Sequence, residues 1–276
     1  AICLGDEETI FLIDPDRKRV EHLRVTDGAR TAVLPLSPFQ TPVSTQPRPT
    51  VLMTGQSCLL LRTSTSGSQA VVVDLRTGRQ RWTLPEGTVN AFRADSQTVG
   101  TLSSTGVVTL RELNTGRTTA TVTLQVPQNM DNVFCLHDRQ RWFIGMHSAE
   151  AGGPRRFGVT FSEPLNGRLA AIRKSDGRLL WERTLSHSHM PVPQPGSIPV
   201  LVLAFSEQPD QAAQRPMIVQ TTFHLIDRRT GDTIFNRQFA GNSAAYLVEP
   251  DPVQKRVEIQ TARRTLRLDF QKTDDQ

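Results

Sequence analysis

The sequence predicts an all-β protein, and three observations carry this prediction. A hairpin motif with a central glycine recurs along the 276 residues, short runs alternate between apolar and polar side chains, and no segment follows the helical period. Pairs of further strand-like runs precede the hairpins and complete four-stranded antiparallel units. Such units repeated around an axis are the blades of a β-propeller, which leaves only short strand edges exposed.

The hairpin motif has a fixed plan. Its first strand ends on a charged residue, a Thr or Asp precedes the turn glycine, and an aromatic residue follows four positions later. The Thr or Asp side chain bonds the local backbone, glycine supplies positive φ, and the aromatic residue packs between neighbouring repeats. Three strong copies contain Asp74, Gly78 and Trp82, then Gly177 and Trp181, then Asp227, Gly231 and Phe235; two weaker copies keep Leu110, Glu112, Thr115, Gly116 and Ala120, and Leu12, Asp14, Lys18 and His22.

The spacing of these copies sets the expected organisation. We expect one β-propeller domain over residues 1–276, with five to six sectors visible, as part of a seven- or eight-bladed ring in a longer protein. The last strands are completed either by the strand near Ile2–Leu4 or by chain beyond this sequence. The expected blades are residues 1–25 (partial), 50–85, 89–124, 131–185, 198–239 and 243–270 (partial).

Composition excludes several classes of protein. The net charge of +5 comes from 28 Arg and 4 Lys against 27 acidic residues, but the arginines are dispersed along the sequence. With one Tyr and three Trp, the aromatic platform that single-stranded nucleic acids need is missing, so nucleic-acid binding is not favoured. No run approaches the roughly 18 apolar residues of a spanning helix. Three widely spaced cysteines, Cys3, Cys58 and Cys135, favour buried free thiols over a disulfide framework.

The long connections are the predicted binding surface, because binding residues concentrate on loops held by a rigid scaffold. Residues 26–49, 148–166 and 186–197 are expected to emerge on one face. There Arg155 and Arg156 offer bidentate contacts to an anion. His187 and His189, two apart, together with His147, are candidate metal ligands, or else solvated imidazoles, because a third ligand is not evident.

The hairpins resemble the PQQ-like repeat of the quinoprotein-dehydrogenase-like β-propellers, whose tryptophan-docking motif reads Ala-x-Asp-x-x-Thr-Gly-x-x-x-Trp. The resemblance implies the propeller fold and favours a bacterial periplasmic or extracellular location. Dehydrogenases of this family use adjacent cysteines, a calcium-bound carboxylate set and an Asp base. No two cysteines are adjacent here, so no cofactor, metal or catalytic residue is carried over. The matching positions are Asp74, Thr77, Gly78 and Trp82; Ala171, Gly177 and Trp181; Asp227, Thr230 and Gly231.

These observations favour a non-catalytic module for macromolecular interaction or scaffolding, with a protein partner or the rest of a larger chain as its target. Catalytic signatures such as GxSxG, GxGxxG and HExxH are absent from the sequence. The alternative is a quinoprotein-like dehydrogenase or redox-complex subunit completed by chain outside this sequence. Asp131 and Glu163 are the carboxylates most worth locating for that alternative.

Overall fold

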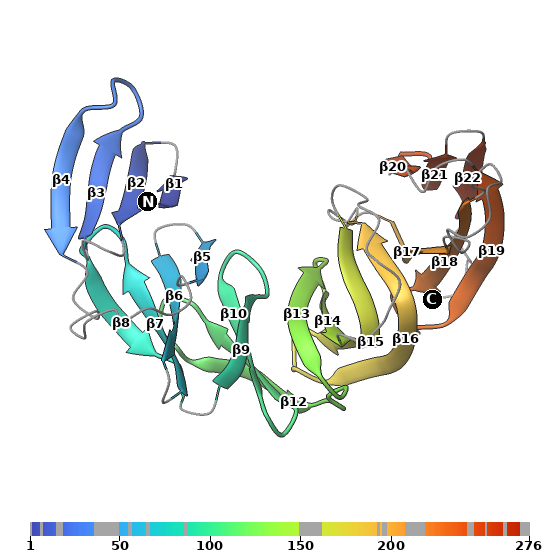
Figure 1. The fold of residues 1–276 in the computed structure, drawn as a ribbon, viewed down its shortest axis with the longest axis horizontal. Coiled ribbons are helices and arrows are strands. Elements are labelled where there is room, and N and C mark those ends of the chain that lie inside the picture. The colour runs from blue at the N-terminus through green and yellow to red at the C-terminus, as the bar shows by residue number, and fades with distance from the viewer. Residues whose placement is uncertain are drawn as a thin grey trace, which may run out of the picture. The chain divides into compact units, whose positions relative to one another are not determined.

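The computed structural model has β-strands as its regular elements and, among the described residues, no helix (Figure 1). The described part of the chain therefore contains no helix that is long and apolar enough to cross a bilayer. The structure describes residues 2–5, 8–14, 19–35, 50–54, 57–64, 67–85, 88–148, 162–191, 194, 198–207, 219–241, 246–251, 253–261 and 264–270.

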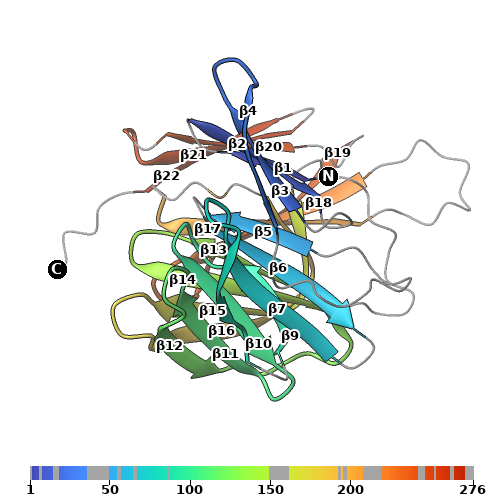
Figure 2. The ribbon, with the colours of Figure 1, turned by 90° about the vertical axis from the view of Figure 1, so that its left-hand side faces the viewer.

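The chain divides into two compact units, residues 1–124 and 125–276. The first unit holds three four-stranded sheets, each an antiparallel meander in chain order (Figures 1 and 2). The sheets comprise β1 (Ile2–Gly5), β2 (Thr9–Asp14), β3 (Arg19–Arg24) and β4 (Arg30–Pro35); β5 (Thr50–Thr54), β6 (Ser57–Ser64), β7 (Gly67–Asp74) and β8 (Arg79–Thr83); and β9 (Thr88–Arg93), β10 (Thr98–Ser103), β11 (Val107–Glu112) and β12 (Thr118–Thr123).

The second unit holds a seven-stranded and a three-stranded antiparallel sheet. The larger sheet is two blades joined where the end of the long strand β16 reaches β17, at the single pair His189–Ala204. Its strands are β13 (Met130–His137), β14 (Arg141–Ser148), β15 (Ser162–Arg173), β16 (Leu179–Pro191), β17 (Val200–Glu207), β18 (Val219–Asp227) and β19 (Thr233–Gly241); the smaller sheet is β20 (Tyr246–Asp251), β21 (Arg256–Thr261) and β22 (Thr265–Asp269).

The predicted all-β fold with four-stranded antiparallel blades is confirmed. Three expected loops, however, contain strand: β4 lies within residues 26–49, β15 begins at Ser162, and β16 continues to Pro191. Their Pro, Ser and Thr content suggested loops, but pairing with a neighbouring strand satisfies the backbone, as in the Ser162–Pro191 pair. How the two units complete a ring, and thus the single-domain assignment, stays a prediction.

The first strand does not complete the C-terminal sheet. Residues Ile2–Gly5 pair with β2, so the first sheet has four strands where a partial blade over residues 1–25 was expected. The missing strand was β4, which pairs with β3 from Arg19 opposite Pro35 to Leu23 opposite Arg30. The sheet of β20–β22 has three strands among the described residues, as its sequence indicated.

Two tryptophans dock blade to blade in the same way. The Trp82 indole N–H donates to the Leu113 carbonyl at 2.8 Å, and the Trp181 indole donates to the Arg228 carbonyl at 3.0 Å. Each ring also lies against the turn glycine of the following repeat, where a Cβ on Gly116 or Gly231 would sit 2.8 or 2.7 Å from the indole. The predicted packing of these aromatic residues between repeats is therefore confirmed.

A histidine makes the same contact in the weakest repeat. His22 occupies the aromatic position four residues after Lys18, and its Nε2 donates to the Leu75 carbonyl at 2.7 Å. Leu75, Leu113 and Arg228 are equivalent, because each follows the last residue of the strand that leads into the motif's turn. The repeat with alanine here, Ala120, is the last of the first unit.

The residue before the turn glycine bonds the local backbone as predicted: Thr77 Oγ1 accepts the Arg79 N–H at 3.4 Å, and Thr230 Oγ1 accepts the Asp232 N–H at 3.2 Å. The aspartate that ends the preceding strand adds further bonds. Asp74 Oδ1 accepts the Arg76 N–H at 2.9 Å, and Asp227 Oδ1 accepts the Arg229 N–H at 2.6 Å. Burial raises the pKa of the Asp74 carboxyl, but hydrogen bonds from Arg81 and the turn amides outweigh it, so the pKa lies below its ordinary value. The turn glycines Gly78, Gly116, Gly177 and Gly231 have φ of 67°, 73°, 70° and 78°.

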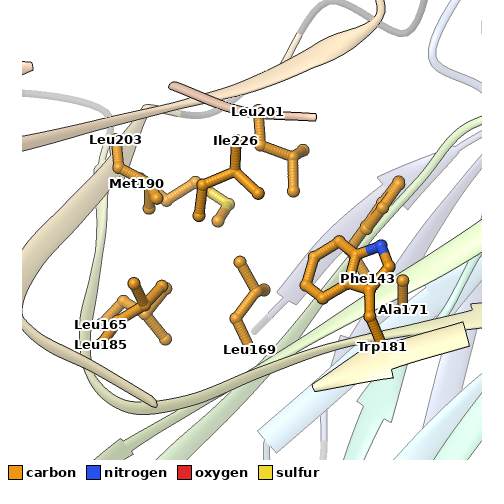
Figure 3. Packing of buried hydrophobic residues seen from close by; sticks show 10 residues of the cluster. All are labelled: Phe143, Leu165, Leu169, Ala171, Trp181, Leu185, Met190, Leu201, Leu203 and Ile226. Atoms are coloured by element: carbon orange, nitrogen blue, oxygen red, sulfur yellow. The ribbon is translucent and has the colours of Figure 1, made fainter. Parts of the chain in front are cut away.

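The docking tryptophan of the second unit belongs to its core (Figure 3). The Trp181 ring lies beside Phe143, with ring centroids 6.0 Å apart. Phe235, the third motif aromatic, packs against a second cluster that includes Val257 and Ile259 of β21. The first cluster consists of Phe143, Leu165, Leu169, Ala171, Trp181, Leu185, Met190, Leu201, Leu203 and Ile226.

Replacing the docking glycine tests the importance of the aromatic contact. We expect Gly231→Ala to lower the free energy of unfolding by about 3 kcal/mol, because the methyl group collides with Trp181 in addition to the strain of positive φ. Gly28→Ala is the matched control: its φ is +68°, yet the space around its Cβ is open. It should cost only about 1 kcal/mol. Urea unfolding followed by circular dichroism measures both, and equal losses would contradict the docking role.

Candidate binding site

Three turns of the second unit border an open hollow of about 650 Å³ with a strongly basic lining. They are the β13–β14, β15–β16 and β18–β19 turns. We call this site the basic hollow. It lies at the end of β14 and β15 opposite the connection 149–161, so it is remote along these strands from the predicted long-loop face. Its lining residues are Arg139, Gln140, Arg141, Arg173, Lys174, Ser175, Leu180 and Arg229.

The first two turns are tied together by backbone. Asp138 Oδ1 accepts the N–H groups of Gln140 and Arg141 at 2.8 and 2.7 Å, which fixes the β13–β14 turn. The Lys174 N–H of the next turn then donates to the Gln140 carbonyl at 2.8 Å. The cations on these two turns are therefore presented by a rigid backbone.

A buried arginine ties the third turn to the first. Arg228 is 3% exposed, and its Nε donates to the Val200 carbonyl at 2.9 Å. Its Nη1 lies 3.8 Å from Asp138, which also pairs with Arg141 at 3.2 Å. Burial lowers the pKa of Arg228 to about 10, which leaves the guanidinium charged at neutral pH.

The cations at the rim are only partly neutralised. Among the described residues, no carboxylate lies within ion-pair distance of the exposed Arg139 or Arg229. Arg173 pairs with Asp176 at 3.2 Å, but both side chains are more than two-fifths exposed, so the pair contributes little. The Lys174 ammonium lies 5.3 Å from the ring centroid of Trp142, which is a favourable contact.

A comparison of the repeats shows that the fold does not require a cation at the position of Arg228 and Lys174. The carbonyl that receives the docking ring belongs to a buried leucine in the first unit, Leu75 or Leu113, and to Arg228 in the second. Lys174 occupies the same position of its own repeat. Docking uses only the backbone oxygen, so it does not require a cation at this position.

The sequence-predicted binding residues do not form this site. Arg155 and Arg156 lie outside the described residues. His187 and His189 fall in β16, not in a loop as expected, which follows from the pairing of that strand with β15 and β17. The proposed anion contact at Arg155 and Arg156 and the long-loop face stay predictions.

The third candidate metal ligand is engaged by protein groups. His147 Nδ1 accepts the Asn166 N–H at 3.1 Å, and its Nε2 lies 3.9 Å from Asp131. Glu163 accepts a hydrogen bond from Asn132 at 3.4 Å, which places both candidate carboxylates at this end of the blade. Within the described part of the chain, no three His, Cys, Asp or Glu side chains gather as a metal-binding group.

Sequence reasoning missed the basic hollow because its cations are dispersed along the chain. Arg139 and Arg229 are separated by five strands, β14 to β18, and come together only because neighbouring blades pack against each other. The available signal was the comparison between repeats, which shows Lys174 and Arg228 where other copies have leucine. The arginines of this group are dispersed in the sequence, as expected, but lie on neighbouring turns in the structure.

Comparisons with known proteins extend only to the fold. No protein-family model matches the chain, and no curated protein matches it. Similar solved structures include BamB from Moraxella catarrhalis (14% identity, TM-score 0.45, 95% of this chain and 72% of that one) and hydrazine synthase of Kuenenia stuttgartiensis (12%, 0.44, 96% and 74%). A europium-containing methanol dehydrogenase aligns at 13% identity and TM-score 0.45; 86% of this chain spans half of that one.

The sheets and docking contacts define the class of protein. The chain is built from β-propeller blades joined by aromatic residues that dock on the turn of the next repeat. The tryptophan-docking contact that the motif predicts is confirmed at Trp82 with Gly116 and at Trp181 with Gly231.

Removing the buried carboxylate tests how the basic hollow is held. We expect Asp138→Asn to lower the free energy of unfolding by about 3 kcal/mol, because the amide can still cap the turn but leaves the buried Arg228 charge uncompensated. Asp176→Asn is the control, since Asp176 also caps a turn and pairs with an arginine three residues away, but in solvent. It should cost less than about 1 kcal/mol.

A second substitution separates charge burial from packing. Adding Arg228→Leu to Asp138→Asn should restore part of the lost stability, because leucine occupies the equivalent position in the first unit. Urea unfolding of the two single variants and the double variant measures the coupling. Additive losses would contradict the ion pair as the element that holds the third turn.

Proposed function

We propose that this chain is a non-catalytic β-propeller module that binds a protein partner, within a larger protein or complex, at the basic hollow. The observation that carries the proposal is the gathering of five cations from three turns in one hollow of about 650 Å³. This size falls in the range of ligand-binding pockets.

The chemistry of the lining supports binding over catalysis. Ser175 provides the one hydroxyl among the lining residues, and none of the others is a histidine or a carboxylate that would act as its general base. Arginine, by contrast, is enriched in protein interfaces and at their energetic centres. The lining therefore suits recognition of an anionic group.

The energetics of Arg228 support a role beyond stability. A buried ion pair is often no more stabilising than apolar residues of similar volume. The first unit has buried leucines at this position and retains the same docking contact. Arg228, unlike the leucines, forms an ion pair with Asp138. This pair holds the turn that carries Arg229 against the turn that carries Arg139.

Site-specific photo-crosslinking tests the proposal. The full chain would carry benzoylphenylalanine at Ser175, in the basic hollow, or at Ser104, an exposed turn residue of the first unit that serves as control. In extracts of the source cells, we expect a protein adduct at position 175 that excess unlabelled chain suppresses, and none at position 104. The absence of a specific adduct at position 175 would contradict the proposed function.

A separate assay addresses catalysis. Dye-linked dehydrogenase turnover by the purified chain after titration with PQQ, together with a new cofactor absorption band, would favour the alternative of a quinoprotein-like enzyme. We expect neither.

A further inference from the structure

We infer that the basic hollow recognises an acidic peptide segment, and that it does so through the side-chain carboxylates of two or more Asp or Glu residues. The inference rests on the proposed function, because it specifies the part of the protein partner that enters the site. Three properties of the site carry the inference: two guanidinium groups without an ion-pair partner among the described carboxylates, a solvent-exposed Arg173–Asp176 pair that an incoming carboxylate can displace, and a lining that suits a peptide better than a nucleic acid.

Arg139 and Arg229 are the primary contacts. Both side chains are exposed, and no described carboxylate lies within ion-pair distance of either. A guanidinium presents paired N–H donors that match the two oxygens of a carboxylate. Since the two arginines stand on different turns, β13–β14 and β18–β19, they are placed to hold two separate acidic side chains of one segment.

One arginine of the lining, Arg173, already makes this kind of contact with a carboxylate outside the lining. Asp176 pairs with Arg173 at 3.2 Å through a solvent-exposed interaction, which an incoming carboxylate can displace at little cost. Asp138 cannot compete in this way. It is 10% exposed, and its oxygens are already engaged by Arg141, Arg228 and two turn amides.

The uncharged lining favours a peptide. Gln140 and Ser175 offer hydrogen bonds for backbone groups, and Leu180 offers apolar surface for the methylene groups of Glu. None of the described lining residues is aromatic, and the adjacent Trp142 is 4% exposed beneath Lys174, so these residues form no platform on which a base could stack. The site is also a discrete hollow, whereas a nucleic-acid backbone is followed by an extended basic track.

Fluorescence anisotropy of labelled peptides on the full chain tests the inference. We expect a hexaglutamate peptide to bind and a hexaglutamine peptide not to bind. Affinity for the acidic peptide should fall as salt rises, because the contacts are partly exposed charges. The double variant Arg139→Gln with Arg229→Gln should weaken binding about tenfold or more.

The chain supplies a matched control. Arg76 occupies the same position in a turn of the first unit as Arg229 occupies in the second unit. In both turns, the arginine N–H donates to the aspartate two residues earlier. Arg76→Gln should leave the affinity unchanged while changing the net charge by the same amount as one of the two site substitutions. An equal loss from Arg76→Gln would overturn the inference, because it would reduce binding to general charge attraction.

Other anions complete the test. Inorganic phosphate and an octathymidylate should compete with the acidic peptide only weakly. Stronger binding of the oligonucleotide, or no binding of hexaglutamate, would overturn the inference. Failure of the inference and failure of the proposed function give different results. A protein adduct at position 175 that persists in the double variant Arg139→Gln with Arg229→Gln would support the proposed function but contradict an acidic ligand. Hexaglutamate binding without any protein adduct would support an acidic ligand but contradict the proposed function.

Discussion

In three of the repeats, a single backbone carbonyl ties one blade to the next. It belongs to the residue that follows the strand leading into the motif's turn, and it accepts a ring N–H from the preceding repeat: His22 to Leu75, Trp82 to Leu113 and Trp181 to Arg228. A carbonyl buried beside an aromatic ring is costly unless it is bonded. The contact therefore fixes both the distance and the rotation of one blade against the next.

The same contact constrains the turn that follows. In the two tryptophan cases the ring lies against the turn at Gly116 or Gly231, where any side chain would meet the indole. The side chain beside the accepting carbonyl is under no such constraint, because docking uses only its backbone. This freedom allows leucine in the first unit and cations in the second without loss of the blade contact.

Arg228 joins the docking contact to the basic hollow. Its carbonyl receives Trp181, while its guanidinium lies beside Asp138, whose carboxylate caps the β13–β14 turn. One residue thus links the strand β16, the β18–β19 turn and the β13–β14 turn. The positions of Arg139 and Arg229 in the hollow follow from contacts whose first purpose is to stack two blades.

The sequence by itself determined the all-β class, the blade pattern and the docking aromatics, because these depend on local alternation, turn chemistry and the spacing within one hairpin. Even the weak copy ending at His22 held its register in the structure. Strand ends such as β4 and the last residues of β16 were not predictable, since their backbone is satisfied by a neighbouring strand that composition does not reveal. The basic hollow was decided only by the tertiary structure: Arg139, Arg173 and Arg229 lie far apart in the chain, and the packing of one blade on the next, not any local pattern, brings their charges together.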